Sequence, residues 1–225
     1  MLSIIRYART HFHPSALLLG LQLMLLILYA VFEEPQGERA LVTAFSVVVP
    51  MLVIWVVHHS PAIDWIAWIL AVPAFLFSVL TAVLSQPVFY YLAALLSAPL
   101  YFYAAASLIA YMMEDFRVTI DELYAAGATF TMLAWGFANL FLVWEALRPG
   151  SFISSVRPDQ SLTFVDLLFV SFTNLSSVGL SDIVPVTTSA RVLLMFEQFV
   201  GLGYIAVVVS RLVGLTLQQR SRSRS

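Results

Sequence analysis

The sequence predicts an all-α integral membrane protein with six transmembrane helices and one short re-entrant helix followed by a loop. Only 11% of the 225 residues are charged and 61% are hydrophobic, whereas about a quarter of a soluble domain is charged. Six apolar stretches are each long enough to cross a hydrocarbon core of about 30 Å, which takes about 20 helical residues. None alternates with a period of two, which excludes lipid-facing strands. The stretches are 15–32, 40–57, 62–84, 88–113, 123–147 and 190–217.

Prolines and arginines define the breaks and the orientation of these stretches. Pro50, Pro73 and Pro99 lie inside predicted helices, where we expect kinks because neighbouring helices can satisfy the freed carbonyls. All eleven basic residues are arginines. With a cytoplasmic N-terminus, most of them fall on the cytoplasmic side, as the positive-inside rule requires. We therefore expect a multi-pass protein of the cell membrane with both termini in the cytoplasm.

Residues 1–113 are predicted to form a four-helix membrane domain without gating charges. A voltage sensor needs a helix with several arginines, since each charge moved supplies about 2.3 kcal/mol per 100 mV. The stretch Val88–Met113 contains no charged residue. Residues 114–122 are rich in charge, and we expect a solvated cytoplasmic linker there. Thr119 and Glu122 match a capping box that opens the next helix.

The segment from Ser161 to Leu217 differs from the rest of the chain. Thr163 followed by Asp166 is a typical start of a helix, but the apolar pattern after it, Phe164–Thr173, has only about half the length of a span. The polar stretch Asn174–Asp182 follows directly. Non-helical backbone at membrane depth is tolerated only where it is buried in protein or lines a water-filled cavity. We therefore predict a re-entrant segment.

This segment resembles the pore region of tetrameric potassium channels, whose filter has the sequence TVGYG. The likeness extends from about Thr119 to the end of the chain, and the bacterial two-helix pore modules share its flanking motifs. The residues that carry it are Ser177-Val-Gly-Leu-Ser-Asp182, Pro185 and Arg191 around the loop, with Pro149-Gly-Ser-Phe152 before it and Glu197-Gln198 and Arg211-Leu-Val-Gly214 after it.

The resemblance implies a pore domain over residues 123–217. It places an outer helix first, a pore helix at 163–175, the filter at 176–182, the inner helix at 190–217 and a cytoplasmic tail at 218–225. Backbone carbonyls of the filter would hold K⁺ ions. One loop cannot surround an ion, so four copies would meet on an axis as a homotetramer. The ion-binding residues would be Ser177, Val178, Gly179, Leu180 and Ser181.

Individual roles follow for the residues in and around the filter. We expect a positive φ at Gly179, packing of Val178 behind the loop, and the innermost ion site at Ser177. Thr173, Ser176, Asp182 and Glu197 would support the filter, with Asp182 bracing it from behind. Glu145 and Glu197 are expected near the extracellular helix ends, where they would brace the outer pore by hydrogen bonds. Gly201 and Gly203 are either a gating hinge or sites of close helix packing.

Two positions depart from TVGYG. Leu180 replaces the aromatic residue, and Ser181 replaces the second glycine. If Ser181 needs a left-handed conformation, it costs about 1–2 kcal/mol per subunit. A filter altered in this way could have fewer sites and be less selective or slower.

The sequence thus favours a passive potassium channel that is not gated by an arginine sensor. The alternatives are a non-selective or weakly conducting cation channel, and a membrane scaffold or sensor without ion flux. No nucleophile–base pair or carboxylate cluster lies in the apolar stretches, so we do not expect an enzyme. We expect K⁺ and no other cofactor, and as partners the lipid bilayer and further copies of the chain. With a net charge of −2, no nucleic acid partner is expected, nor is a soluble regulatory domain.

Overall fold

The computed structural model describes residues 14–31, 64–84, 86–114 and 119–222. Within these ranges the regular elements are helices and two three-residue strands, joined by turns and loops. The elements are α2 (Pro14–Val31), α4 (Asp64–Leu84), α5 (Pro87–Met113), α6 (Ile120–Leu147), β1 (Phe152–Ser154), α7 (Phe164–Leu175), β2 (Ile183–Pro185) and α8 (Thr188–Arg222). The strands pair antiparallel, with Ile153 opposite Val184.

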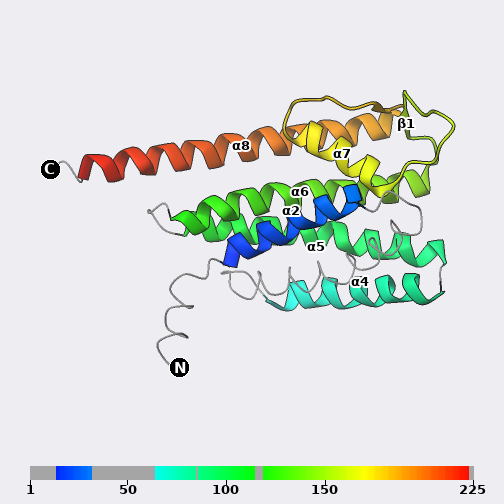
Figure 1. Cartoon of the computed structure of the whole chain (residues 1–225), viewed down its shortest axis with the longest axis horizontal. Helices are drawn as coiled ribbons and strands as arrows, with labels where there is room; N and C mark the ends of the chain where they lie inside the picture. The colour runs from blue at the N-terminus through cyan, green and yellow to red at the C-terminus, as the bar shows by residue number, and fades with distance from the viewer. Residues whose placement is uncertain (1–13, 32–63, 85, 115–118, 223–225) are drawn as a thin grey trace.

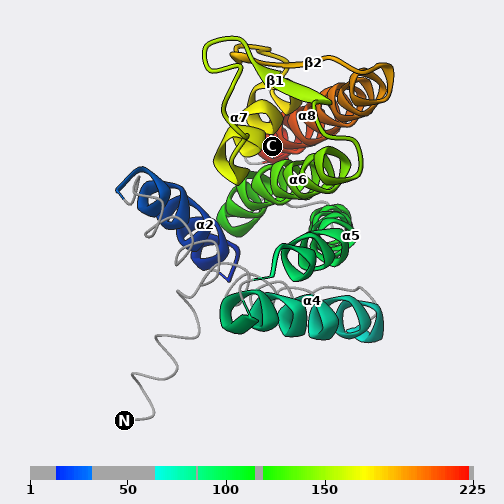
Figure 2. The same ribbon diagram turned by 90° about the vertical axis from the view of Figure 1, so that its right-hand side faces the viewer.

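The long helices lie side by side along one direction, and the strands cap one end of the bundle (Figure 1). Seen from that end, α4, α5 and α6 follow one another as a stack (Figure 2). Helices α7 and α8 lie on the far side of α6, and α2 packs against the flank of α6. The central helix α6 therefore packs against the helices α2, α5, α7 and α8, whereas α4 packs on α5.

Four of the described helices are long and apolar enough to cross a membrane. They are Trp65–Leu84, Pro87–Met113, Ile120–Leu147 and Thr188–Arg211. The helix expected at 15–32 is present as α2, whose apolar part Ser15–Tyr29 is shorter. The span expected at 40–57 lies outside the described residues, so the total of six remains a prediction.

Three predicted boundaries move. Helix α6 begins at Ile120 and not at 123, because the Thr119 hydroxyl accepts a hydrogen bond from the Glu122 N–H at 3.2 Å. Helix α8 begins at Thr188 and continues to Arg222, so most of the expected tail at 218–225 extends the inner helix. A strand pair that the sequence pattern did not indicate joins the segments before α7 and before α8.

Small residues and aromatic rings build the core between α5 and α6. Buried alanines such as Ala94 and Ala104 line α5, and small side chains let helix backbones approach closely when lipid surrounds them. Tyr101 meets Trp135 edge-on with ring centroids 5.9 Å apart. In contrast, α4 exposes large apolar side chains along its outer face, namely Trp65, Trp68, Ile69, Val72, Leu76, Val83 and Leu84. An apolar exterior over a packed core fits a lipid surrounding.

A buried polar contact fixes α2 on α6. The side chain of Gln22 is 1% exposed, and its Oε1 lies 2.5 Å from the Thr131 hydroxyl. That hydroxyl is also 2.8 Å from the Ala128 carbonyl oxygen. In apolar surroundings neither amide nor hydroxyl can turn to water, so the contact selects one register between the two helices.

The start of α6 links three further elements. The Asp121 carboxylate accepts hydrogen bonds from the Ser15 hydroxyl of α2 at 2.9 Å and from the Tyr111 hydroxyl of α5 at 3.1 Å. The neighbouring Glu122 is 4% exposed and forms an ion pair with Arg211 of α8 at 3.6 Å. The expectation of a fully solvated linker over 114–122 is therefore wrong at its end, because helix packing buries Glu122 and pairs it.

We predict that Thr131→Val lowers the stability of the protein by about 1 kcal/mol, because interhelical hydrogen bonds in membrane proteins contribute about that much. Thr81→Val is the matched control, since the Thr81 hydroxyl donates to the Phe77 carbonyl oxygen of its own helix. Thermal denaturation of the purified protein in detergent checks this. Equal midpoints for the two variants would contradict the assigned contact.

Candidate functional site

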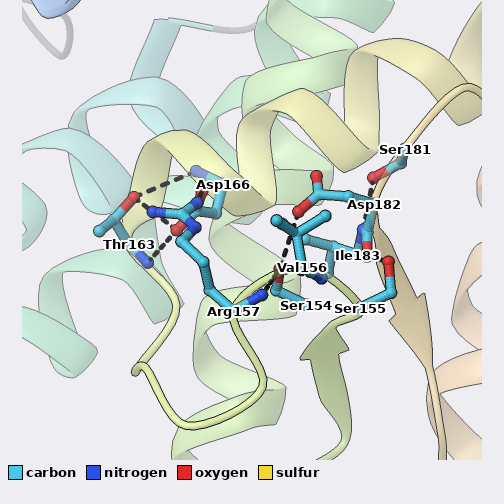
Figure 3. A network of polar contacts seen from close by, with 9 residues as sticks. All are labelled: Ser154, Ser155, Val156, Arg157, Thr163, Asp166, Ser181, Asp182 and Ile183. Atoms are coloured by element: carbon cyan, nitrogen blue, oxygen red, sulfur yellow. Dashed lines mark hydrogen bonds and ion pairs between the residues drawn. The ribbon is translucent and has the colours of Figure 1, made fainter.

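The short helix α7 starts at a complete capping box (Figure 3). The Asp166 N–H donates to the Thr163 hydroxyl at 3.2 Å, and the Thr163 N–H donates to the Asp166 carboxylate at 2.8 Å. Arg157 adds an ion pair to the same carboxylate at 2.9 Å. The predicted N-cap is thus confirmed, and the helix proper begins one residue later than 163.

Helix α7 ends after 12 residues, a length of about 18 Å that cannot cross a core of about 30 Å. Leu167, Leu168, Val170 and Leu175 bury its apolar face. After Leu175 the chain turns, and residues 176–182 run back to strand β2, which pairs with β1 (Figure 1). Helix and loop therefore enter and leave the bundle at the same end.

The carbonyl oxygen of Thr173 organises the loop. It accepts hydrogen bonds from the N–H groups of Val178 at 3.0 Å and Gly179 at 2.9 Å, and from the Ser176 hydroxyl at 3.1 Å. The Ser177 N–H donates to the Asn174 carbonyl oxygen at 2.9 Å. The last turn of α7 thereby holds the first four residues of the loop.

These hydrogen bonds determine where two loop carbonyls point. All peptide bonds here are trans, and in a trans peptide the C=O of one residue points opposite to the N–H of the next. Since the N–H groups of Val178 and Gly179 both point at Thr173, the carbonyl oxygens of Ser177 and Val178 both point away from α7. Alternation of left- and right-handed residues produces such alignment of neighbouring peptide groups.

Positive φ angles occur at Gly179 (67°) and Ser177 (60°). The first was predicted. The left-handed conformation that was considered for Ser181 occurs at Ser177 instead, and Ser181 has no positive φ. The cost of about 1–2 kcal/mol for a non-glycine residue in the left-handed region therefore falls on Ser177, at the inner end of the loop.

The outer half of the loop is held differently. The Ser181 N–H donates to the Gly179 carbonyl oxygen at 3.1 Å, and the Ser181 hydroxyl accepts from the Ile183 N–H at 3.1 Å. Val178 and Leu180 have side chains that are 68% and 74% exposed. Val178 was expected to pack behind the loop. In the single chain it does not, because the N–H groups and not the side chains face α7.

Asp182 anchors the outer end of the loop to the segment around β1 (Figure 3). Its carboxylate accepts from the Ser154 hydroxyl at 2.7 Å, and its carbonyl oxygen accepts from the Ser155 N–H at 2.7 Å. The Ser154 oxygen in turn accepts from the Arg157 N–H at 3.1 Å. These contacts tie Asp182 to β1 and to Ser155 directly after it, and its role in bracing a filter stays a prediction.

The two glutamates that were expected near the outer helix ends, Glu145 and Glu197, have different partners. Glu145 accepts from the N–H groups of Gly150 at 2.6 Å and Phe152 at 3.0 Å, which fixes the turn after α6. Glu197 is instead fully buried and accepts a hydrogen bond from Ser171 in the middle of α7. Its expected place near the extracellular end stays a prediction, and Glu197 lies in the first third of α8.

Two further contacts involve residues for which no role was predicted. Gln198 donates to the Asn174 side chain at 3.0 Å, and Ser171 lies between α6 and α8. A serine in an apolar helix looks like any small residue, so no pattern distinguishes it. Gly201 lies against the backbone of Leu175, whereas Gly203 has open space where a Cβ would be.

Side-chain metal ligands do not gather in this region. Over the described ranges, no group of three or more His, Cys, Asp or Glu side chains is placed to hold a metal ion. A backbone cation site would use other atoms, the aligned carbonyl oxygens of Ser177 and Val178.

We predict that Gly179→Ala destabilises the protein by about 1–2 kcal/mol, because it places a Cβ on a residue with φ 67°. No atom lies within 4 Å of the new Cβ, so the loss reports backbone strain and not a clash. Gly20→Ala is the control. No atom lies within 4 Å of a Cβ added to Gly20, and alanine in helix α2 should stabilise the protein by up to about 1 kcal/mol. Equal melting midpoints of the two variants in detergent would contradict the requirement for a positive φ at Gly179.

The comparison with protein families gives a match over the region that contains this loop. Residues 140–218 match the family model described as Ion channel, which covers the end of α6, both strands, α7, the loop and most of α8. The match covers about a third of the chain. Comparisons with curated proteins and with solved structures give no match. Together with the apolar helices, the match indicates a membrane protein with a segment similar to an ion channel domain.

Proposed function

We propose that this protein is a homotetrameric potassium channel in which ions pass through rings of loop carbonyls. The observation that carries the proposal is the pair of N–H groups, from Val178 and Gly179, that converge on the Thr173 carbonyl oxygen. They turn the carbonyls of Ser177 and Val178 to the opposite side, away from α7. A dehydrated K⁺ ion needs such oxygens in place of its water shell.

The surroundings of the loop suit a cation. The C-terminal end of α7 carries the negative end of the helix dipole and lies directly before Ser177. The short helix and the returning loop fit a re-entrant segment, which is tolerated in a membrane when it lines a water-filled path. In four copies, two aligned carbonyls per chain would form two rings of four oxygens.

Exposed apolar side chains favour assembly with further copies of the chain. In the single chain, Val178 and Leu180 of the loop and Phe199 of α8 are 68%, 74% and 78% exposed. The same helix also exposes Met195, Phe196 and Leu202. A closed symmetric ring would bury such a surface between subunits. It would also place the loops around one axis.

The helices before α6 support a channel without an arginine voltage sensor. Helix α5 (Pro87–Met113) has no charged residue, and α4 has none after Asp64 at its start. A sensor would need several charges within such a helix. The span expected at 40–57 likewise contains no arginine in its sequence.

One observation favours a second candidate, a non-selective or weakly conducting cation channel. The Gly179 carbonyl oxygen accepts a hydrogen bond from the Ser181 N–H, which directs it within its own loop. Leu180 has no hydroxyl to anchor the outer filter. A filter with fewer carbonyl rings replaces less of the ion's water shell and would discriminate less between K⁺ and Na⁺.

We predict that the purified protein in liposomes passes K⁺ and Rb⁺ faster than Na⁺. Ser181→Gly should change selectivity or rate, because it removes the hydroxyl that accepts from Ile183 and loosens the turn at Gly179. Ser161→Gly, in the exposed loop before α7, is the control. Equal rates for K⁺ and Na⁺ would support the second candidate. Leak-level flux for the parent and both variants would leave the scaffold or sensor function.

We predict a mass about four times 25.0 kDa for the detergent-extracted protein. Phe199→Ala should weaken the tetramer, since truncation of a hot-spot residue at the centre of an interface costs about 2 kcal/mol or more. Trp68→Ala, on the exposed face of α4, should leave the mass unchanged. Native mass spectrometry across a dilution series measures both. A monomer at all concentrations contradicts the proposed assembly.

A further inference from the structure

The inner helix α8 touches the end of α7 at three consecutive points. Glu197 accepts a hydrogen bond from Ser171, and Gln198 donates to Asn174 at 3.0 Å. One turn further along α8, Gly201 lies against the backbone of Leu175. We call these three contacts the α7–α8 seam. Its last point on α7, Leu175, directly precedes the loop 176–182.

The first contact is a buried polar junction of three helices. Glu197 and Ser171 are both completely buried. The Ser171 hydroxyl is also 2.8 Å from the Ala134 carbonyl oxygen of α6. The second carboxylate oxygen of Glu197 is buried without a hydrogen-bond partner among the described residues. A carboxyl group in such surroundings is costly, and an apolar residue would fill the space at lower cost.

The last contact requires glycine. A Cβ on Gly201 would lie 2.1 Å from the Leu175 carbonyl oxygen and 2.9 Å from its Cα, which are backbone atoms that cannot rotate aside. Gly203, two residues on, has no atom within 4 Å of such a Cβ. Of the two glycines considered as a hinge, Gly201 is therefore a contact point between the inner helix and the base of the loop.

We propose that Glu197, Gln198 and Gly201 are positioning residues that transmit displacements of α8 to the loop carbonyls. This inference rests on the proposed channel function. The seam holds Ser171 to Leu175 of α7, and the same stretch contains Thr173, whose carbonyl oxygen orients the N–H groups of Val178 and Gly179. A shift of α8 thus moves the acceptor that aligns the carbonyls of Ser177 and Val178. Conduction is controlled at the loop and not by a free bend of α8 at Gly201.

The test compares Gly201→Ala with Gly203→Ala, and Glu197→Leu with Glu197→Gln. The variant Glu197→Gln keeps an oxygen that can accept from Ser171. Two readouts report on the loop: the ratio of Rb⁺ to K⁺ flux in liposomes, and the K⁺ concentration that half-protects the tetramer against heating. We expect Gly201→Ala and Glu197→Leu to shift at least one readout by about fivefold or more, the lower range of coupling between sites. Gly203→Ala and Glu197→Gln should stay within about twofold, the scatter of independent substitutions.

The outcomes separate the two proposals. Absence of K⁺-dependent protection and of flux in the parent removes the channel function itself. If the parent conducts while Gly201→Ala and Glu197→Leu only lower the melting temperature and leave both readouts unchanged, the contacts of the seam are only structural. This result overturns the proposed transmission but not the channel function. If Gly201→Ala does not assemble, Gln198→Leu replaces it, because Gln198 is exposed on α8 and its loss removes only the bond to Asn174. An unchanged flux ratio and half-protecting concentration in Gln198→Leu then counts against the seam.

Discussion

The carbonyl oxygen of Thr173 is the acceptor on which the arrangement of the loop depends. In about a third to a half of helices, a left-handed residue after the last turn lets the following N–H groups bond to the last carbonyls. Here the N–H groups of Val178 and Gly179 bond to the Thr173 carbonyl oxygen. The helix end and the loop therefore stabilise each other. The capping box at Thr163 sets the opposite end of α7, so the position of Thr173 follows from where the helix starts.

This arrangement has a local cost at Ser177. A residue with a side chain seldom adopts a φ of 60°, and the loop accepts this conformation where the potassium-channel sequence has threonine. Strain of this kind persists only when surrounding contacts over-determine it. The hydrogen bonds of Ser177, Val178 and Gly179 to the last turn of α7 supply those contacts. The outer half of the loop relies instead on Asp182 and its bonds to Ser154 and Ser155.

Local patterns predicted the elements that local chemistry controls. Thr163 and Asp166 marked the start of α7, and the length of the apolar stretch after them marked α7 as too short to span. Contacts between distant segments were not predictable in this way. Glu197 was expected on the inner helix, but its contact with Ser171 depends on how α8 packs along α7. Ser171 carries no pattern at all, since its role comes from two helices that meet it from either side.

Two adjacent carboxylates at the start of α6 have a consequence for the whole bundle. Asp121 holds α2 and α5 through Ser15 and Tyr111, and Glu122 holds α8 through Arg211. Two neighbouring residues of α6 therefore contact α2 and α5 on one side and the C-terminal part of α8 on the other. A tilt of α2 relative to α6 would thus strain a residue adjacent to the one that holds α8.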